Sequence, residues 1–326
     1  MSKVPESILQ NVGRVIDTYN IFGGSKDVVV AYSGGKDSFF LCLVLKELGF
    51  NIQPVIIDIG FNLEWDLAKK NAERLGLNPV VLNLECLKNI SCDAHESVCH
   101  YFGIFEKVSN NKNKLTSLCT PCYNAKITAI KSWATHSNTK VIAFGHHSTD
   151  CISSLLKSYY LYSDRWDNSN SVFNIQNIID LIDEFKVKIH DEKFKSKMFS
   201  GIEGLISHKY VGTDEPIRQT IDDSDIQIVR PLFFVFENAI REYYSHTDFK
   251  FPSIECRDFR TEKAFTCREF VQCSLSGLDS EMMDALQKFT LLSLNSDGSL
   301  AYNVRNRRNE ILGDLYKSEN ICDKKL

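Results

Sequence analysis

The stretch from Val28 to Ser38, "VVVAYSGGKDS", joins an apolar run to a Gly-Gly-Lys turn. The run Val28–Tyr32 is rich in β-branched residues, which predicts a buried strand. The run Lys36–Leu48 ends at a glycine and predicts a helix. Glycines between a strand and a helix let backbone N–H groups approach phosphate oxygens, and the helix N-terminus carries a partial positive charge. The stretch therefore predicts a phosphate-binding loop.

A strand followed by a helix recurs along the chain. Further strands are predicted at residues 53–58, 79–84, 140–145 and 226–232, and further helices at 4–19, 63–75, 122–134, 151–162 and 234–244. This alternation predicts an α/β fold, with a parallel twisted sheet and helices on both faces. Ligands of such sheets bind beyond the carboxyl ends of the strands. We therefore expect Ser33–Ser38, Asp58 and Gly145–Asp150 to share one site.

Changes in composition divide the chain into five segments. They are an N-terminal helix at 1–20, a core at 21–162, a polar and partly helical insertion at 163–225, a completion of the core at 226–275, and a C-terminal segment at 276–326. No apolar run approaches the roughly 18 residues that span a membrane, and the first residues lack the apolar centre of a signal peptide. We therefore expect a cytoplasmic protein.

The charge and the cysteine count restrict the chemistry. The 326 residues carry a formal net charge of -4, which disfavours tight binding of nucleic acid by bulk electrostatics. The 11 cysteines are an odd number in a chain without an export signal, so reduced thiols, metal ligation or redox chemistry are expected rather than a disulfide framework.

Two common phosphate loops do not fit the opening stretch. A Walker A loop has a hydroxyl residue after its lysine, where this chain has Asp37, and the Rossmann G-x-G-x-x-G pattern is absent. The hexapeptide Ser-Gly-Gly-Lys-Asp-Ser is then either a glycine turn that only joins strand to helix or a phosphate loop of another kind. This hexapeptide resembles the PP-loop signature of ATP pyrophosphatases, which cleave ATP between the α- and β-phosphates and adenylate the acceptor.

A cysteine pair starts another predicted helix. Cys119 and Cys122 in "LCTPCYNAK" have the spacing of half a zinc site, a redox dithiol, part of an iron–sulfur site, or two core thiols. The succession "SGGKDS", "CTPC", "GHHSTD", "IVRPL" and "FPSIEC" resembles the tRNA 2-thiocytidine synthetase group of PP-loop enzymes. That resemblance implies that Cys119, Cys122 and Cys256 hold a 4Fe-4S cluster, with zinc or buried thiols as alternatives.

The chain departs from the group at two places. The Gly-His-His segment usually continues with Arg-Asp-Asp, whereas this chain has Ser148-Thr149-Asp150, so only Asp150 carries over. The group often has another cysteine three residues after the late one, where this chain has Phe259. A further set, Cys92, His95 and Cys99, lies along one helical face, and both a metal site and a buried helix face fit it.

The resemblance implies a set of site residues. The catalytic residues are Lys36, Asp37 and Asp150, with Asp37 or Asp150 helping to bind Mg²⁺. The nucleotide-binding residues are Ala31, Tyr32, Ser33, Gly34, Gly35, Lys36, Asp37, Ser38, Asp58, Gly145 and His146. Arg230 is a further candidate for a phosphate contact, or for a pair with a carboxylate.

The acceptor has several candidates. Family resemblance favours 2-thiolation of a tRNA base, with ATP as substrate, a cysteine desulfurase as sulfur donor and a homodimer as one candidate assembly. Phosphorothioation of the DNA backbone is an alternative, in which a partner subunit contacts the DNA. An ATP-dependent amidation without sulfur and a zinc-stabilised ATP-binding regulatory module are the others.

Overall fold

The computed structural model describes residues 3–58, 65–83, 119–154, 216–221, 224–252, 287, 291 and 294–299. Positions 92, 95, 99 and 256 and most of the segment 163–225 lie outside these ranges. The chain divides into two compact units, one formed by Met1–His147 with Ile217–Ala264 and the other by Ser148–Pro216 with Phe265–Leu326. The finer division into five segments stays a prediction.

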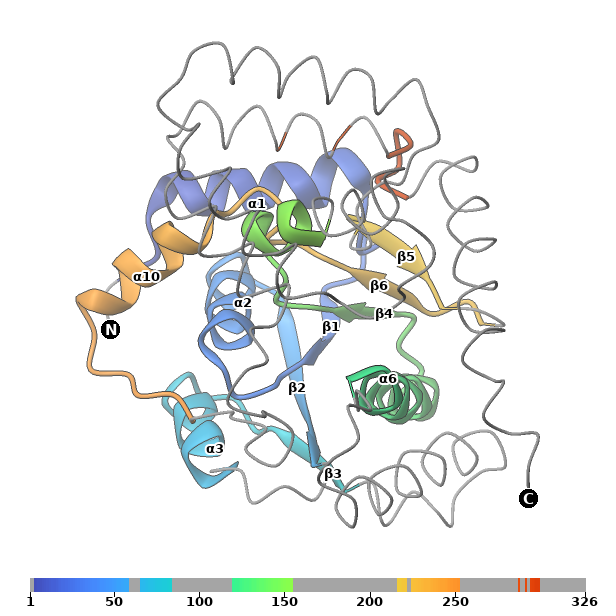
Figure 1. Ribbon diagram of the computed structural model, residues 1–326, viewed down its shortest axis with the longest axis horizontal. Helices are drawn as coiled ribbons and strands as arrows, with labels where there is room; N and C mark the ends of the chain where they lie inside the picture. Colours follow the sequence, from blue (N-terminus) through green and yellow to red (C-terminus); the bar gives the residue numbers. More distant parts are fainter. Residues whose placement is uncertain are drawn as a thin grey trace, which may run out of the picture. The chain divides into compact units, whose positions relative to one another are not determined.

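The described strands of the first unit form one six-stranded sheet in the order β3-β2-β1-β4-β6-β5 (Figure 1). Their bounds are β1 (Asp27–Ala31), β2 (Asn51–Asp58), β3 (Val80–Asn83), β4 (Val141–Ala143), β5 (Arg218–Thr220) and β6 (Gln227–Val229). All neighbours pair in parallel except β5, which pairs antiparallel with β6 at the edge. The predicted α/β fold with a mostly parallel sheet is confirmed.

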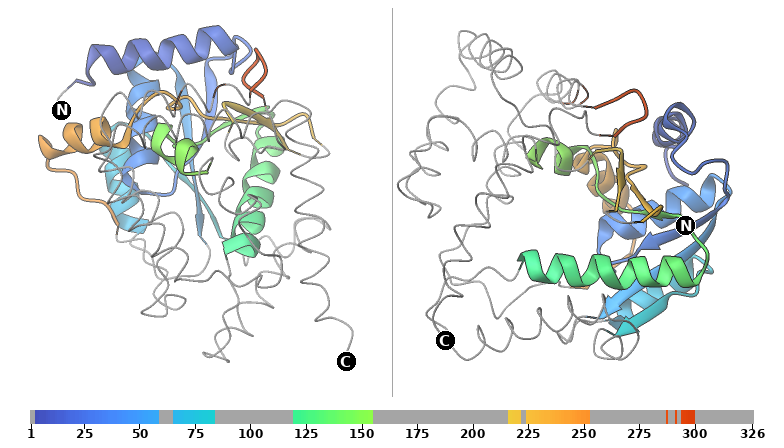
Figure 2. Two further views of the ribbon diagram at one scale, coloured as in Figure 1. Left: turned by 45° about the horizontal axis from the view of Figure 1, so that its top comes forward. Right: turned by 90° about the vertical axis from the view of Figure 1, so that its right-hand side faces the viewer.

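Helices cover both faces of this sheet, as predicted. Within the described ranges they are α1 (Glu6–Tyr19), α2 (Lys36–Glu47), α3 (Trp65–Arg74), α6 (Cys119–His136) and α10 (Glu237–Ser245). Figure 1 shows α2 and α6 on opposite sides of β1 and β2, and Figure 2 shows α6 as one uninterrupted helix beside the strands. The α6 side has an apolar core made by Val29, Val55, Ile130, Ala134, Ile142 and Ile226.

Helix α2 is buried along most of its length. Every residue from Ser38 to Leu45 is buried, because α1 and α10 both pack against the helix while its inner side faces the sheet. A helix that is apolar all round requires cover on every side. The element that begins at the phosphate-loop sequence is therefore a buried part of the core.

Strand β5 was not predicted. Its three residues, Arg218, Gln219 and Thr220, are polar and lack the alternation of apolar side chains that identifies a strand from sequence. Pairing with β6 is what makes the segment extended. Arg218 also joins β5 to α1, since its Nη2 donates hydrogen bonds to the carbonyl oxygens of Tyr19 and Asn20 at 2.8 and 2.6 Å.

None of the helices within the described ranges has the length and apolar character that crossing a bilayer requires.

Candidate functional site

The candidate site lies where the direction of strand order reverses. From β1, the strands β2 and β3 follow on one side, and β4 and β6 follow on the other. The carboxyl ends of β1 and β4 are therefore the topological switch point, which is where ligands bind in open parallel sheets. Ser33–Ser38 follow β1, and Gly145–His147 follow β4. The structure thus brings together two of the motifs that the sequence singled out.

Two glycines allow the close approaches on which the loop depends. Gly34 has φ +78, and a Cβ placed on it would lie 2.7 Å from Cβ of Ala68. Gly145 faces the backbone at the start of α2, where an added Cβ would lie 2.8 Å from both N and Cα of Ser38. Only a residue without a side chain fits either position without movement of its neighbours. In this structure Gly145 therefore has a packing role against the phosphate loop.

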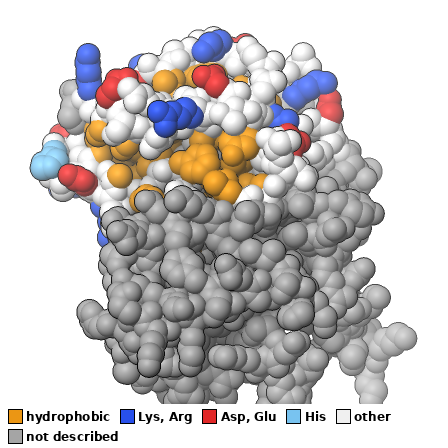
Figure 3. Space-filling view, turned by 90° about the horizontal axis from the view of Figure 1, so that it is seen from above, with side chains coloured by type: hydrophobic (Ala, Val, Ile, Leu, Met, Phe, Trp, Pro, Cys, Tyr) orange, Lys and Arg blue, Asp and Glu red, His pale blue; other side chains and the backbone are white. Residues whose placement is uncertain are grey.

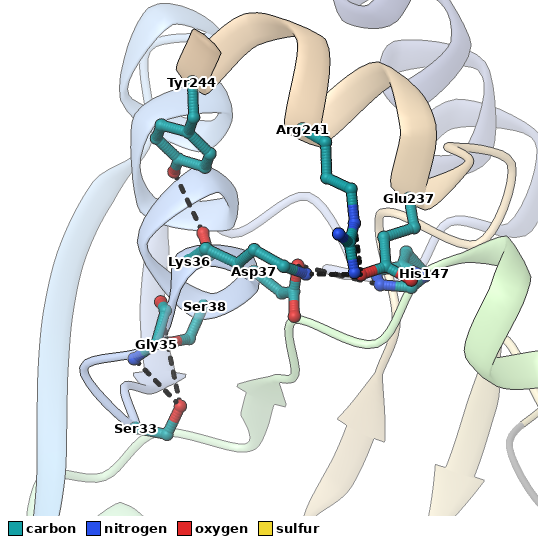
Figure 4. Close-up of polar contacts among 9 residues, drawn as sticks. All are labelled: Ser33, Gly35, Lys36, Asp37, Ser38, His147, Glu237, Arg241 and Tyr244. Carbon is teal, nitrogen blue, oxygen red and sulfur yellow. Dashed lines mark hydrogen bonds and ion pairs between the residues drawn. The ribbon is translucent and has the colours of Figure 1, made fainter. Parts of the chain in front are cut away.

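The loop is held by hydrogen bonds between its own residues (Figure 4). Oγ of Ser33 and Oγ of Ser38 lie 3.1 Å apart, and Oγ of Ser38 donates to the carbonyl oxygen of Gly35 at 3.1 Å. Gly35 is the N-cap of α2, and no side chain caps the helix there. The first N–H groups of a helix have no partner within it, so this turn offers backbone donors to an anion.

Lys36 lies at the centre of a chain of charged groups (Figure 4). Its Nζ is 2.6 Å from Oδ1 of Asp37 and 2.9 Å from Oε1 of Glu237, and Arg241 approaches the same Oε1 at 2.8 Å. Nε2 of the buried His147 lies 3.7 Å from Oδ1 of Asp37. Two cations and two carboxylates therefore balance one another beside the loop, before any charge on the histidine is counted.

The titration of Glu237 reflects this setting. Burial raises the pKa of Glu237, but the hydrogen bonds from Lys36 and Arg241 and the positive charge of Lys36 lower it by more. The pKa of Glu237 therefore lies below its ordinary value of 4.5, and the carboxylate is ionised at neutral pH.

Two of the predicted nucleotide-binding residues have side chains that belong to the packing. Ala31 is the last residue of β1 and packs against the core on the α6 side. The hydroxyl of Tyr32 donates to the carbonyl oxygen of Ala68 in α3 at 2.8 Å, and burial raises the pKa of Tyr32. A nucleotide would therefore contact these two residues through their backbone atoms.

Asp58 and His146 follow other strands of the sheet. Asp58 ends β2 and accepts a hydrogen bond from Nδ2 of Asn83 at 3.3 Å. His146 follows β4, and its Nδ1 accepts a hydrogen bond from Nε of Arg230 at 3.3 Å. Arg230 is 1% exposed and also donates to Oε1 of Gln219 at 3.2 Å. The described contacts of Arg230 are therefore structural ones, and they brace His146.

The remaining predicted residues belong to the second compact unit, to the start of α6, or to positions outside the described ranges. Asp150 is buried in the helical residues 148–154, which belong to the second compact unit. Cys119 and Cys122 lie one turn apart at the start of α6, and Cys256 is outside the described ranges. Among the residues that the structure describes, no group of three histidine, cysteine or acidic side chains is placed to hold a metal ion.

Sequence reasoning missed Glu237 and Tyr244. Both belong to α10, and the hydroxyl of Tyr244 donates to the carbonyl oxygen of Lys36 at 2.9 Å. An acidic residue in a first helical turn is common for reasons of the helix dipole alone, so nothing in the sequence distinguished Glu237. The contact with Lys36 depends on tertiary packing.

On the face drawn in Figure 3, the described lysine and arginine side chains do not form a continuous basic surface. Figure 3 shows lysine and arginine side chains interspersed there with acidic ones. This distribution agrees with the slightly acidic net charge of the chain.

Comparison with known proteins identifies one matching family model and several similar chains. The family model of the queuosine biosynthesis protein QueC matches residues 27–154. The tRNA-cytidine(32) 2-sulfurtransferase of Histophilus somni is 29% identical over 162 residues, which cover 49% of this chain and 48% of that one. The tRNA-5-methyluridine(54) 2-sulfurtransferase of Thermotoga maritima is 27% identical over 155 residues, 46% of each chain. The chain thus spans about half the length of these curated relatives.

A solved structure supports the same fold. The U34-tRNA thiolase NcsA from Methanococcus maripaludis, solved with its 4Fe-4S cluster, matches with a TM-score of 0.50 at 13% identity, covering 93% of this chain and 80% of that one. At this identity the likeness shows the fold alone. The family model and the curated relatives together confirm the predicted resemblance to PP-loop ATP pyrophosphatases and to their tRNA 2-thiocytidine synthetase group.

Proposed function

We propose that this chain is an ATP pyrophosphatase that activates a tRNA base by adenylation so that sulfur can be incorporated. The observation that carries the proposal is the uncapped first turn of α2 at the carboxyl end of β1, with the ammonium of Lys36 beside it. Backbone donors, a helix N-terminus and an ammonium group in one place make a site for a polyphosphate. The resemblance of the loop to the PP-loop assigns that polyphosphate to ATP.

The residues around the loop have distinct roles in this proposal. The backbone of Ser33–Ser38 and the ammonium of Lys36 hold the β- and γ-phosphates. Asp37 or Asp150 helps to bind Mg²⁺, which neutralises phosphate charge when bound. Pyrophosphate leaves as an anion, so fixed donors and a fixed cation at its oxygens lower the barrier to its departure.

The proposed transfer of sulfur depends on the cysteines. Cys119 and Cys122 are one helical turn apart in α6, which is a spacing at which two thiolates reach one metal. With Cys256 they would hold a 4Fe-4S cluster, which would supply a non-protein iron position for sulfur. A cysteine desulfurase is the proposed source of that sulfur, and a homodimer is the proposed assembly.

The names of the relatives support tRNA as the acceptor. Both curated relatives described above are named as tRNA 2-sulfurtransferases, and each match covers about half of the relative's length. The net charge of -4 means that any tRNA contact depends on local basic groups rather than on bulk charge. The acceptor is therefore the part of the proposal that most requires a direct test.

The test combines product analysis with metal analysis. Anaerobically purified and reconstituted protein is incubated with ATP, Mg²⁺, sulfide and either tRNA or DNA, and the released pyrophosphate, AMP and thiolated nucleosides are measured. We expect pyrophosphate, AMP and a thiolated tRNA base. Release of ADP and phosphate would refute the pyrophosphatase assignment, sulfur in the DNA backbone would refute tRNA as the acceptor, and zinc without iron would refute the cluster.

A pair of lysine variants tests the loop itself. Lys36→Ala removes the cation at the phosphates, and we expect pyrophosphate release to fall at least about a hundredfold. Lys140→Ala is the matched control, because Lys140 forms an exposed ion pair with Asp225, a kind of pair that contributes little. Equal activity of the two variants would contradict the assignment of Lys36.

A further inference from the structure

Helix α10 contacts Lys36 at both of its ends. The carboxylate of Glu237 lies 2.9 Å from Nζ of Lys36, and the hydroxyl of Tyr244 donates to the carbonyl oxygen of Lys36 at 2.9 Å. Glu237 and Tyr244 are seven positions apart, which is two helical turns, so they lie on the same face of α10. One face of a helix far along the chain thus fixes the main chain and the side chain of a single residue (Figure 4).

Aromatic packing sets the position of α10 on α2. The rings of Phe40 and Tyr243 meet edge to face at 5.3 Å between centroids, and Tyr244 contacts Phe251 in the same way at 4.8 Å. Phe40 is fully buried and Tyr243 is 6% exposed. The two polar contacts to Lys36 are therefore held by a packed apolar interface rather than by mobile surface side chains.

The ammonium of Lys36 keeps a donor for a ligand while it is held. An ammonium has three N–H donors, and its described contacts with Asp37 and Glu237 use two of them. Arg241 binds the same oxygen of Glu237, so the carboxylate is itself fixed and its charge is partly compensated. Lys36 can thus contact a phosphate oxygen without first leaving its partners.

We propose that Glu237 and Tyr244 are positioning residues that hold Lys36 for contact with the phosphates, an inference that rests on the proposed role of Lys36 in ATP binding. Removal of the Glu237 carboxylate has two opposite effects on the affinity for ATP. Loss of a negative charge favours the anionic ligand, while loss of the ion pair frees a side chain that must then be ordered on binding. The affinity therefore changes little, and the catalytic step, which depends on placement, changes more.

The variant Glu237→Gln tests this division because it keeps the shape of the side chain. We expect kcat for pyrophosphate release to fall about tenfold to a hundredfold and KM for ATP to change less than about threefold. Glu242→Gln is the matched control, since Glu242 is exposed on the same helix, and we expect wild-type constants. The proposal would be overturned if Glu237→Gln had the same kcat as Glu242→Gln, or if only KM changed.

A double variant tests whether Glu237 acts through Lys36. If it does, Glu237→Gln has no further effect on single-turnover pyrophosphate release in a Lys36→Ala background. Additive losses would show a separate role and overturn the proposal. Glu237→Asp keeps the charge on a shorter side chain, and we expect a kcat between those of wild type and Glu237→Gln. This variant keeps the test decisive if the glutamine variant does not fold.

An NMR experiment tests the positioning of the Lys36 ammonium without the reaction. In ¹⁵N-labelled protein, an ammonium held by two carboxylates exchanges its protons slowly enough to give an Nζ–H signal, which the Lys36→Ala variant identifies by its loss. We expect this signal in wild type and in Glu242→Gln, but not in Glu237→Gln. An unchanged signal in Glu237→Gln would overturn the inference, whereas a wild-type protein that releases no pyrophosphate would overturn only the proposed function.

Discussion

Gly145→Ala is the substitution whose effect the structure defines most sharply. The added Cβ would lie 2.8 Å from N and Cα of Ser38 and 2.9 Å from the carbonyl carbon of Asp37. All three atoms belong to the backbone at the start of α2, so no side chain can rotate away from the new methyl group. The methyl group therefore moves either the segment after β4 or the phosphate loop.

The size of this movement follows from the contact distances. Ordinary van der Waals contact begins at 3.4 Å, so the backbone has to shift by about 0.6 Å. Overpacking of this kind costs about 1 to 3 kcal/mol of stability. A lower entropy of the unfolded chain offsets about 0.4 to 1 kcal/mol of that cost. We expect a net destabilisation of about 1 to 2 kcal/mol, and a loss of about tenfold or more in pyrophosphate release because the loop is displaced.

The assay pairs this variant with Gly13→Ala. Gly13 lies within α1, where an added Cβ meets nothing within 4 Å, so its replacement should raise stability by about 0.5 to 1 kcal/mol through helix propensity. Urea unfolding gives the stability of both variants. Titration calorimetry with a non-hydrolysable ATP analogue gives the affinity, and pyrophosphate release gives the rate.

The two glycine substitutions are expected to change the stability of the protein in opposite directions. If Gly145→Ala is as stable as Gly13→Ala and binds the analogue with wild-type affinity, then the segment after β4 does not press on the loop, and the packing role assigned to Gly145 is wrong. Lower stability with unchanged affinity and rate would contradict only the link between that contact and the phosphates.

Three further predictions concern single residues. Cys119→Ser should lower the iron content of the reconstituted protein and abolish sulfur transfer while pyrophosphate release persists, and full iron retention would remove Cys119 from the ligand set. The pKa of Glu237 is lowered in the folded protein, so its ionised form stabilises the fold above about pH 4.5 and this contribution is lost as the pH falls through the folded pKa. The difference in melting temperature between wild type and Glu237→Gln should therefore be largest near neutral pH and shrink below pH 4.5, and a constant difference from pH 7 to pH 3 would contradict the ion pair. Burial raises the pKa of Cys42, so iodoacetamide at pH 8 should leave the native Cys42 peptide unlabelled in mass spectra, and labelling without denaturant would contradict its burial.

Local patterns were sufficient to predict the described strands of the sheet other than β5, and the helices between them. The predicted strand over residues 53–58 corresponds to β2 at Asn51–Asp58, and the predicted helix 234–244 corresponds to α10 at Glu237–Ser245. These segments have apolar periodicity of their own. Strand β5 has none, because three polar residues become a strand only by pairing with β6. Its existence depends on a partner that the local sequence does not indicate.

The site could be predicted only as far as its loop. The glycines and Lys36 are adjacent in sequence, so their chemistry is visible there. Tyr244 is 208 positions from Lys36, and its contact arises because aromatic rings dock α10 on α2. Arg230 was a candidate for a phosphate contact or for a pair with a carboxylate, and its side chain is buried with hydrogen bonds to His146 and Gln219, which neither candidate role required. Sequence alone does not separate an arginine that binds a ligand from one that braces a core.

The Gly-His-His segment links these observations to the departure from the resembled group. Gly145 packs against Ser38, His146 accepts a hydrogen bond from Arg230, and Nε2 of His147 faces Asp37, so each residue has a partner in the first compact unit. The sequence departs from the group at Ser148, which is also the first residue of the second compact unit. Gly145 and His147 thus face the phosphate loop directly, and His146 between them is held by Arg230. These three contacts are made by residues that the chain shares with the group, so the loop can keep its form while Ser148 and Thr149 differ from the group.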